Sequence, residues 1–223
     1  MKIYIVVPVY NEDERVVDVI DGISKIKFPI IIVDDGSSDN SKSKILKLKS
    51  KNLTFLEHKI NLGKGAALKT GCDYAFSHGA DAVIMMDSDG QHIASDLDQF
   101  VEKLESDEYD LVLGSRNLSM GVPLDRYMGN KIASVVVAFL YGIYVSDLIC
   151  GFRAITKKAY NKIRWDSQGY GVEVETVIKI KKFNLKYCEV PVQTVYYDNF
   201  KGVSILDAFG ILGNLILWKF KNN

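Results

Sequence analysis

The chain has 223 residues and a formal net charge of zero, and 48% of its residues are hydrophobic and 25% charged. This composition is typical of a globular protein, and the length suits one α/β domain. Zero net charge gives no overall field toward nucleic acid, so no nucleic-acid partner is expected. The three cysteines, Cys72, Cys150 and Cys188, form no CxxC pair, which predicts reduced thiols in a cytoplasmic protein and no structural zinc.

Strand-like and helix-like stretches alternate along the first half of the chain. The sequence predicts strands at 3–8, 29–33, 53–56, 82–86 and 111–113, and helices at 11–26, 42–51, 65–77 and 96–105. This alternation is typical of βαβ units, so we predict a Rossmann-like, mostly parallel sheet with helices on both faces. Ligands bind beyond the carboxyl ends of the strands in such sheets.

The pattern changes after residue 114. We predict helices at 126–145 and 172–182 and strands at 186–190 and 192–196. The apolar stretches 132–145 and 203–218 are shorter than the ~18 residues that span a bilayer, so we expect no transmembrane helix. Either stretch can pack in the core or lie in a membrane interface, and we favour the core for the first and the interface for the second. The interpretation is one domain over 1–200 and a C-terminal amphipathic to apolar helical segment over 201–223.

The strand at 82–86 ends in two carboxylates, Asp87 and Asp89, followed by Gly90 and Gln91. Residues i and i+2 of an extended segment point to the same side, and Gln91 joins them if the path continues. Two adjacent carboxylates suit Mg²⁺, which commonly binds one or two of them plus substrate phosphates. A polar loop in which Asp87 caps a helix is the alternative, and these residues alone support both equally.

Polar segments also follow the first two strands, at 10–12 (Tyr-Asn-Glu) and 34–37 (Asp-Asp-Gly-Ser). Each alone is better explained by helix capping. Together, at successive strand ends near Asp87, they favour a shared nucleotide pocket. The segment 61–65 (Asn-Leu-Gly-Lys-Gly) precedes a helix and offers Lys64 to phosphate, but it is neither a Walker A loop nor a Rossmann fingerprint.

Arginine is rare in this chain, and three of its five arginines follow polar or glycine-containing segments: Arg116, Arg126 and Arg153. Arginine is favoured where phosphate is bound in a bidentate manner. We expect a phosphate contact for Arg116 and an ion pair with Asp147 for Arg153. At the start of the predicted helix 172–182, Glu173 and Glu175 can orient a sugar hydroxyl or complement the helix dipole.

Taken together, the segments 7–12, 34–37, 61–65, 87–92 and 114–116 resemble those of family-2 glycosyltransferases, and more narrowly the dolichyl-phosphate mannose and glucose synthase branch. The segments 150–153 and 189–192 extend the resemblance over nearly the whole chain. The resemblance implies a GT-A fold and an inverting enzyme that uses a nucleotide-sugar donor and Mg²⁺ or Mn²⁺.

The resemblance also implies roles for individual residues. The expected nucleotide-binding residues are Pro8, Tyr10, Glu12, Asp35, Lys64 and Asp87; the metal ligands are Asp87, Asp89 and Gln91; the acceptor-phosphate residues are Arg116, Arg126 and Lys201. Of these, Asp89, Arg116 and Arg126 are expected to be catalytic. Ser88 and Gly90 stand where mannose synthases usually carry Ala and Leu, so the sugar stays open.

The expected reaction is transfer of a sugar from a UDP- or GDP-sugar to a polyprenyl (dolichyl-type) phosphate by a protein peripheral on the cytoplasmic face of the membrane. The second pKa of such a phosphate is about 6, so its oxygen is already anionic and no strong general base is needed. Two alternatives stay open. One is transfer to a sugar hydroxyl, with Glu173 or Glu175 as the base; the other is a catalytically silent nucleotide-sugar-binding protein.

Overall fold

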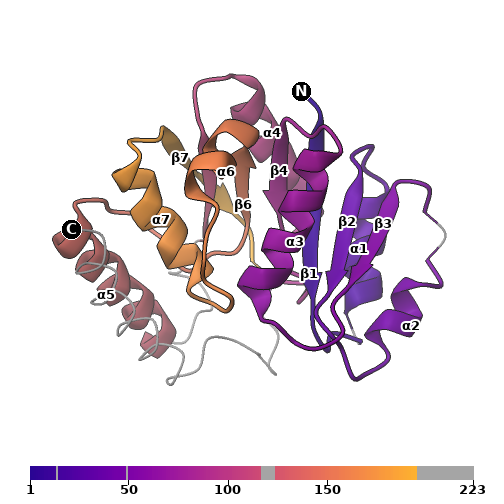
Figure 1. Cartoon of the computed structure of the whole chain (residues 1–223). Coiled ribbons are helices and arrows are strands. Elements are labelled where there is room, and N and C mark those ends of the chain that lie inside the picture. Colours follow the sequence, from indigo (N-terminus) through magenta and orange to yellow (C-terminus); the bar gives the residue numbers. More distant parts are fainter. Residues whose placement is uncertain (14, 49, 117–123, 195–223) are drawn as a thin grey trace.

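The computed structural model describes residues 1–13, 15–48, 50–116 and 124–194, with only the backbone at 124–126. Within these ranges, helices cover both faces of one seven-stranded sheet (Figure 1). The elements in chain order are β1 (Ile3–Val9), α1 (Val16–Ser24), β2 (Ile30–Asp34), α2 (Ser41–Ile45), β3 (Leu53–Glu57), α3 (Lys64–Ser77), β4 (Ala82–Met85), the 3-10 helix η1 (Ala94–Asp96), α4 (Leu97–Glu105), β5 (Leu111–Arg116), α5 (Leu124–Tyr141), β6 (Arg153–Thr156), α6 (Lys157–Ile163), α7 (Val172–Lys182) and β7 (Tyr187–Val192).

The strand order is β3-β2-β1-β4-β6-β5-β7, and every neighbouring pair is parallel except the two pairs that involve β6. The mostly parallel α/β sheet is therefore confirmed, whereas β6 is not among the predicted strands. Because β6 runs antiparallel, its first residue, Arg153, pairs with Met85 near the end of β4 and with Leu113 of β5. The segment just before β6 is thereby brought to the carboxyl ends of those two strands, where ligands are expected.

Several predicted boundaries are wrong, among them the end of the helix predicted at 126–145, which the structure places at Tyr141. Helix α1 begins at Val16 rather than at residue 11, since Asn11 has a left-handed φ of 53° that a helix cannot contain. Helix α2 ends at Ile45 instead of reaching residue 51. The two strands predicted near the end are one strand, β7, which passes through Pro191; an edge strand tolerates proline because it need not donate on its outer side.

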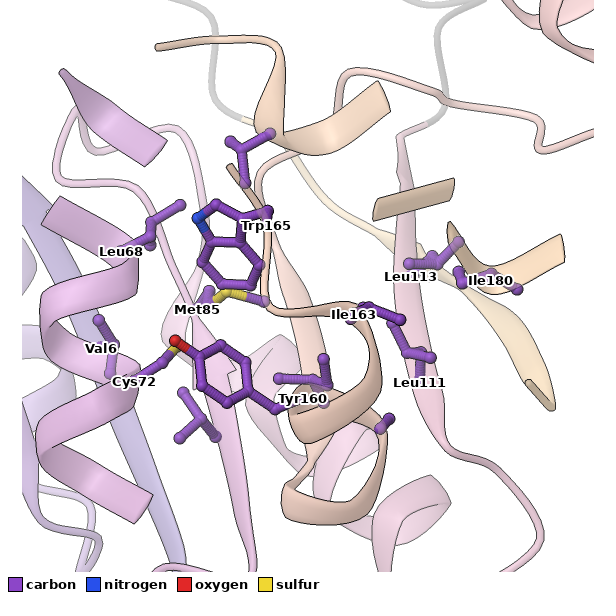
Figure 2. Close-up of a cluster of buried hydrophobic side chains, with 14 of the residues drawn as sticks. Val6, Leu68, Cys72, Met85, Leu111, Leu113, Tyr160, Ile163, Trp165 and Ile180 are labelled. Atoms are coloured by element: carbon purple, nitrogen blue, oxygen red, sulfur yellow. The ribbon is translucent and has the colours of Figure 1, made fainter. Parts of the chain in front are cut away.

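Apolar side chains pack on both faces of the sheet. On one face, Trp165 and Tyr160 lie against Leu68 and Cys72 of α3 (Figure 2). The indole N–H of Trp165 donates to the backbone oxygen of Gly65 at 2.8 Å, which anchors the chain after α6 onto the first turn of α3. This contact matters for function, because the first turn of α3 carries Lys64.

Helix α5 has two different faces. Val137 is fully buried, whereas the exposed side carries Met128, Ile132, Val135 and Phe139, with Phe139 88% exposed. The core packing expected for 132–145 is therefore only half correct. No helix within the described ranges is both long and apolar enough to cross a membrane. The C-terminal helix predicted over 201–223 lies outside the described residues.

Candidate active site

Segments that follow β1, β2 and β4, together with the end of β5, line one cavity of about 540 Å³. This volume lies within the usual range of about 300–1,000 Å³ for ligand sites. The predicted site residues that line it are Pro8, Tyr10, Glu12, Asp35, Lys64, Asp87, Asp89, Gln91 and Arg116. Of the other two, the side chain of Arg126 and all of Lys201 lie outside the described residues.

Asp35 is held by two backbone N–H groups and by one histidine side chain. Its carboxylate accepts hydrogen bonds from the N–H groups of Leu62 and Gly63, at 3.0 and 2.7 Å, and Oδ1 lies 2.7 Å from Nδ1 of His58. Asp35 is 2% exposed, and its hydrogen bonds connect the loop before α3 to the end of β2. The role of Asp35 in nucleotide binding stays a prediction.

Lys64 joins two carboxylates at the centre of the cavity. Its Nζ lies 2.7 Å from Asp87 Oδ1 and 2.8 Å from Glu173 Oε1. Burial alone lowers the pKa of Lys64, but Asp87 and Glu173 outweigh burial and raise that pKa above its ordinary value. Burial likewise raises the pKa of Asp87, but Lys64 outweighs it and holds the carboxyl below its usual range. The pair is therefore charged at neutral pH.

Gly151, from the segment before β6, lies directly against this ion pair. A Cβ added at Gly151 would lie 2.2 Å from Asp87 Oδ2 and 2.7 Å from Lys64 Nζ. A side chain at position 151 would therefore push Asp87 and Lys64 out of their present positions.

Asp89 is held by Gln91, whose backbone N–H donates to Oδ1 at 3.0 Å and whose Nε2 donates to Oδ2 at 2.6 Å. Burial, and then the charge of Asp87, raise the pKa of Asp89 to about 6. In this geometry Gln91 orients Asp89. The role of Gln91 as a metal ligand stays a prediction. Next to it, burial lowers the pKa of His92 to about 4, so the neutral ring accepts from the backbone N–H of Asp87 at 3.4 Å.

The part of the cavity that Asp87 and Asp89 line fits a hard divalent cation. Two half-buried carboxylates, Asp87 and Asp89, line the same cavity, and the charge of Asp87 disfavours ionisation of Asp89 unless positive charge is added. Among the described residues, no group of three or more His, Cys, Asp or Glu side chains could hold a metal by itself. Further ligands would therefore come from substrate phosphates, as is common for Mg²⁺.

Arg116 makes a bidentate contact with Asp147, from Nε at 2.6 Å and from Nη2 at 2.9 Å. Asn130 of α5 donates to Oδ1 of the same carboxylate at 2.8 Å, the oxygen that also accepts from Nη2 of Arg116. Burial alone raises the pKa of Asp147, but Arg116 outweighs it and lowers that pKa. The ion pair predicted for Arg153 is wrong: Arg153 donates instead to the backbone oxygens of Cys150, Leu148 and Glu173.

The two glutamates of α7 have different surroundings. Glu173 lines the cavity and pairs with Lys64. Glu175 accepts from the backbone N–H groups of Asp166 and Ser167, and Lys179 lies 2.7 Å away. Glu175 therefore fixes the segment between α6 and α7. Because only Glu173 lines the cavity, it is the remaining candidate for a catalytic base.

Two residues at the site were missed as such from the sequence, Gly151 and Asp147. The segment 150–153 had been recognised for its resemblance alone, and Asp147 only as a neighbour of Arg153. Without β6 in the predicted topology, nothing placed these residues beside Asp87 and Arg116.

Comparisons with known proteins show the family of this chain. The profile described as Glycosyl transferase family 2 matches residues 4–164. The chain is 30% identical to the UDP-N-acetylglucosamine--dolichyl-phosphate N-acetylglucosaminyltransferase of Methanococcus voltae, covering 97% of this chain and 96% of the relative. It is 27% identical to the polyprenol monophosphomannose synthase of Mycolicibacterium smegmatis, covering 93% and 82%.

The fold is also found in a solved structure, that of glucosyl-3-phosphoglycerate synthase from Mycobacterium tuberculosis in complex with Mn²⁺, uridine diphosphate and phosphoglyceric acid. The TM-score is 0.76 at 19% identity, covering 97% of this chain and 78% of that one. With the profile match over most of its length and its strand-end cavity, this chain belongs to glycosyl transferase family 2 and is an enzyme of that type.

Proposed function

We propose that the enzyme transfers a sugar from a UDP- or GDP-sugar to a polyprenyl phosphate of the dolichyl type. The observation that carries the proposal is that Asp87, Asp89 and Arg116 line the same cavity. A diphosphate bound at the carboxylates and an anionic acceptor bound at the arginine would then meet within it. The Methanococcus relative is named as a transferase to dolichyl phosphate and the Mycolicibacterium relative as a polyprenol monophosphomannose synthase, which supports this acceptor class.

In the proposed reaction, an acceptor phosphate oxygen attacks C1 of the sugar from the face opposite the leaving group. The bond from C1 to the nucleoside diphosphate breaks, its electron pair leaves with the diphosphate, and the configuration at C1 inverts. Because the acceptor oxygen is already anionic near neutral pH, no residue has to remove a proton.

Asp87 and Asp89 would hold Mg²⁺ or Mn²⁺, which would act as a Lewis acid that offsets charge on the leaving diphosphate. Lys64 lies beside Asp87 and would contact the same diphosphate, while Tyr10 and Asp35 would contact the nucleoside. Asp147 fixes the guanidinium of Arg116. Because the Arg116–Asp147 pair has no net charge, we propose that Arg126 and Lys201 neutralise the negative charge of the acceptor phosphate.

We further propose that the enzyme binds peripherally to the cytoplasmic face of the membrane, where its lipid acceptor would lie. The exposed residues of α5, namely Met128, Ile132, Val135 and Phe139, follow helical spacing along one side. Asn130 of the same helix contacts Asp147, the partner of Arg116. An apolar helix face that rests in the interface would thus lie close to the proposed phosphate site.

The direct test is incubation of the protein with dolichyl phosphate, Mg²⁺ or Mn²⁺ and a panel of UDP- and GDP-sugars, with products analysed by mass. We expect one lipid-linked sugar, and its loss on chelation of the metal. Lack of product with every donor, under conditions in which the Methanococcus relative forms one, would contradict the proposal.

The position of Glu173 favours a second candidate, transfer to a sugar hydroxyl, which requires a base. Turnover of a glycan acceptor that disappears in Glu173→Gln, with no product from dolichyl phosphate, would favour this candidate. Metal-dependent formation of any transfer product would exclude the remaining alternative, a catalytically silent nucleotide-sugar-binding protein.

A further inference from the structure

One carboxylate oxygen at the cavity is buried without a partner. Glu173 is 4% exposed and lines the cavity, yet its Oε2 has no hydrogen-bond partner among the described residues. Buried polar atoms in native proteins nearly always have one, so an unpartnered oxygen at a ligand cavity indicates a contact that the ligand completes.

The rest of Glu173 is held firmly. Its Oε1 is 2.8 Å from Nζ of Lys64, and its backbone oxygen accepts from Nη1 of Arg153 at 2.7 Å. With the backbone and one carboxylate oxygen both restrained, Oε2 is a fixed acceptor rather than a flexible one. An ionised carboxylate accepts hydrogen bonds but cannot donate them, so a hydrogen-bonding partner of Oε2 must be an O–H or N–H donor.

The position of this oxygen narrows the partner. Lys64 bridges Glu173 to Asp87, which is proposed to lie at the diphosphate, so Glu173 is one ammonium group away from that end of the donor. The sugar is attached directly to the diphosphate and carries neutral hydroxyl groups. An acceptor phosphate is negatively charged, as the carboxylate is, so electrostatic repulsion disfavours a phosphate beside Oε2.

Building on the proposed function, we propose that Glu173 Oε2 accepts a hydrogen bond from a hydroxyl, or from an acylamino N–H, of the donor hexose. Glu173 is then a specificity-determining residue for the sugar. Its contact with Lys64 sets the position of the sugar relative to the diphosphate.

The test compares binding of a nucleoside diphosphate and of the matching nucleotide sugar to the full chain with Mn²⁺, by calorimetry. A hydrogen bond to a charged group is strong, so Glu173→Gln should weaken binding of the nucleotide sugar by about tenfold. The affinity for the nucleoside diphosphate should stay equal or rise slightly, because Lys64 keeps its charge and loses a competing carboxylate.

A series of donors that each lack one sugar hydroxyl, or the acylamino group, makes the assignment specific. Wild-type protein should bind one of them about tenfold more weakly than the parent, and this discrimination should disappear in Glu173→Gln. Glu173→Asp keeps the charge but withdraws the oxygen, so this variant should also lose the discrimination among donors. It replaces Glu173→Gln in the test if that variant does not fold. Glu175→Gln, on the same helix, is the matched control and should keep the discrimination.

Discrimination that survives intact in the Glu173 variants overturns the inference, as does a wild-type protein that discriminates against none of these donors. In both cases the proposed function stands if lipid-linked sugar still forms. If wild-type protein binds no nucleotide sugar at all, the proposed function fails first, and the inference with it.

Discussion

The two sides of the cavity hold their charged groups in different ways. On the side of β1, β2 and the loop before α3, backbone N–H groups supply two of the contacts to Asp35: Leu62 and Gly63 donate to its carboxylate, and His58 is its side-chain partner. On the side of β5, β6 and α7, charged side chains hold one another, as in the pairs Arg116–Asp147 and Lys64–Glu173. Removing one member of a buried ion pair leaves an uncompensated charge, which costs more than leaving a neutral backbone N–H without its acceptor. Substitutions of charged residues on the side of β5, β6 and α7 should therefore destabilise the protein more than those on the side of β1 and β2.

The largest expected effect is at Asp87, where the two sides meet. Asp87→Asn removes a proposed metal ligand and the partner of Lys64, and we expect turnover to fall about 10²- to 10³-fold, as for loss of one group that stabilises charge in a transition state. Steady-state assays at saturating Mn²⁺ measure this. Asp98→Asn, on the exposed surface of α4, is the control, and turnover of Asp87→Asn equal to that of the control would contradict the proposed metal site.

The next effect compares the two sides directly through their stability. Asp147→Asn leaves the Arg116 guanidinium without its counter-charge, and we expect a loss of about 3 kcal/mol in the free energy of unfolding. In Asp35→Asn the amide oxygen replaces only one of the two carboxylate oxygens, so Leu62 or Gly63 loses its acceptor, and we expect a smaller loss of about 1–2 kcal/mol. Urea unfolding measures both values. Equal losses for the two variants would break the distinction between the sides.

A smaller effect depends on pH. Burial alone raises the pKa of Glu175, but Lys179 and Ser167 outweigh it, so the folded-state pKa lies below the ordinary 4.5. A depressed carboxyl pKa stabilises the fold above the unfolded pKa, and this contribution is lost as the pH falls through the folded value. We expect Glu175→Gln to lower stability by about 1.5 kcal/mol at pH 7 and by progressively less below pH 4.5. A difference from wild type that stays constant over this pH range would show that the charge of Glu175 is not responsible.

The smallest effect concerns the exposed face of α5. Substituting Val135 and Phe139 by serine should change the free energy of unfolding by no more than about 0.5 kcal/mol per site, since both are exposed. Binding to vesicles that contain anionic lipid should weaken by about tenfold if this face enters the interface. Val137→Ser, on the buried side of the same helix, should instead destabilise the fold. Unchanged vesicle binding by the first variant would argue against a membrane contact at this face.

Much of the fold could be predicted because its signals are local. The strands β1, β2 and β4 are continuous apolar runs with helix-length segments after them, and periodicity identifies such βαβ units. The four-residue β6 has no such signal, because an inserted antiparallel strand is defined by its neighbours β4 and β5 rather than by its own residues. The partner of Arg116 was missed for the same reason: Asp147 is 31 positions away and is brought close only through the segment before β6.

The sequence by itself determined the family, the parallel half of the sheet and the residues at strand ends, because these depend on short motifs and on spacing along the chain. Only the tertiary structure decided which charges are paired: Arg116 with Asp147, Lys64 with both Asp87 and Glu173, and Glu175 with the backbone near α7. The physical reason is that an ion pair depends on distances of a few ångströms between side chains that the chain order does not relate. Those distances exist here because β6 folds back between β4 and β5.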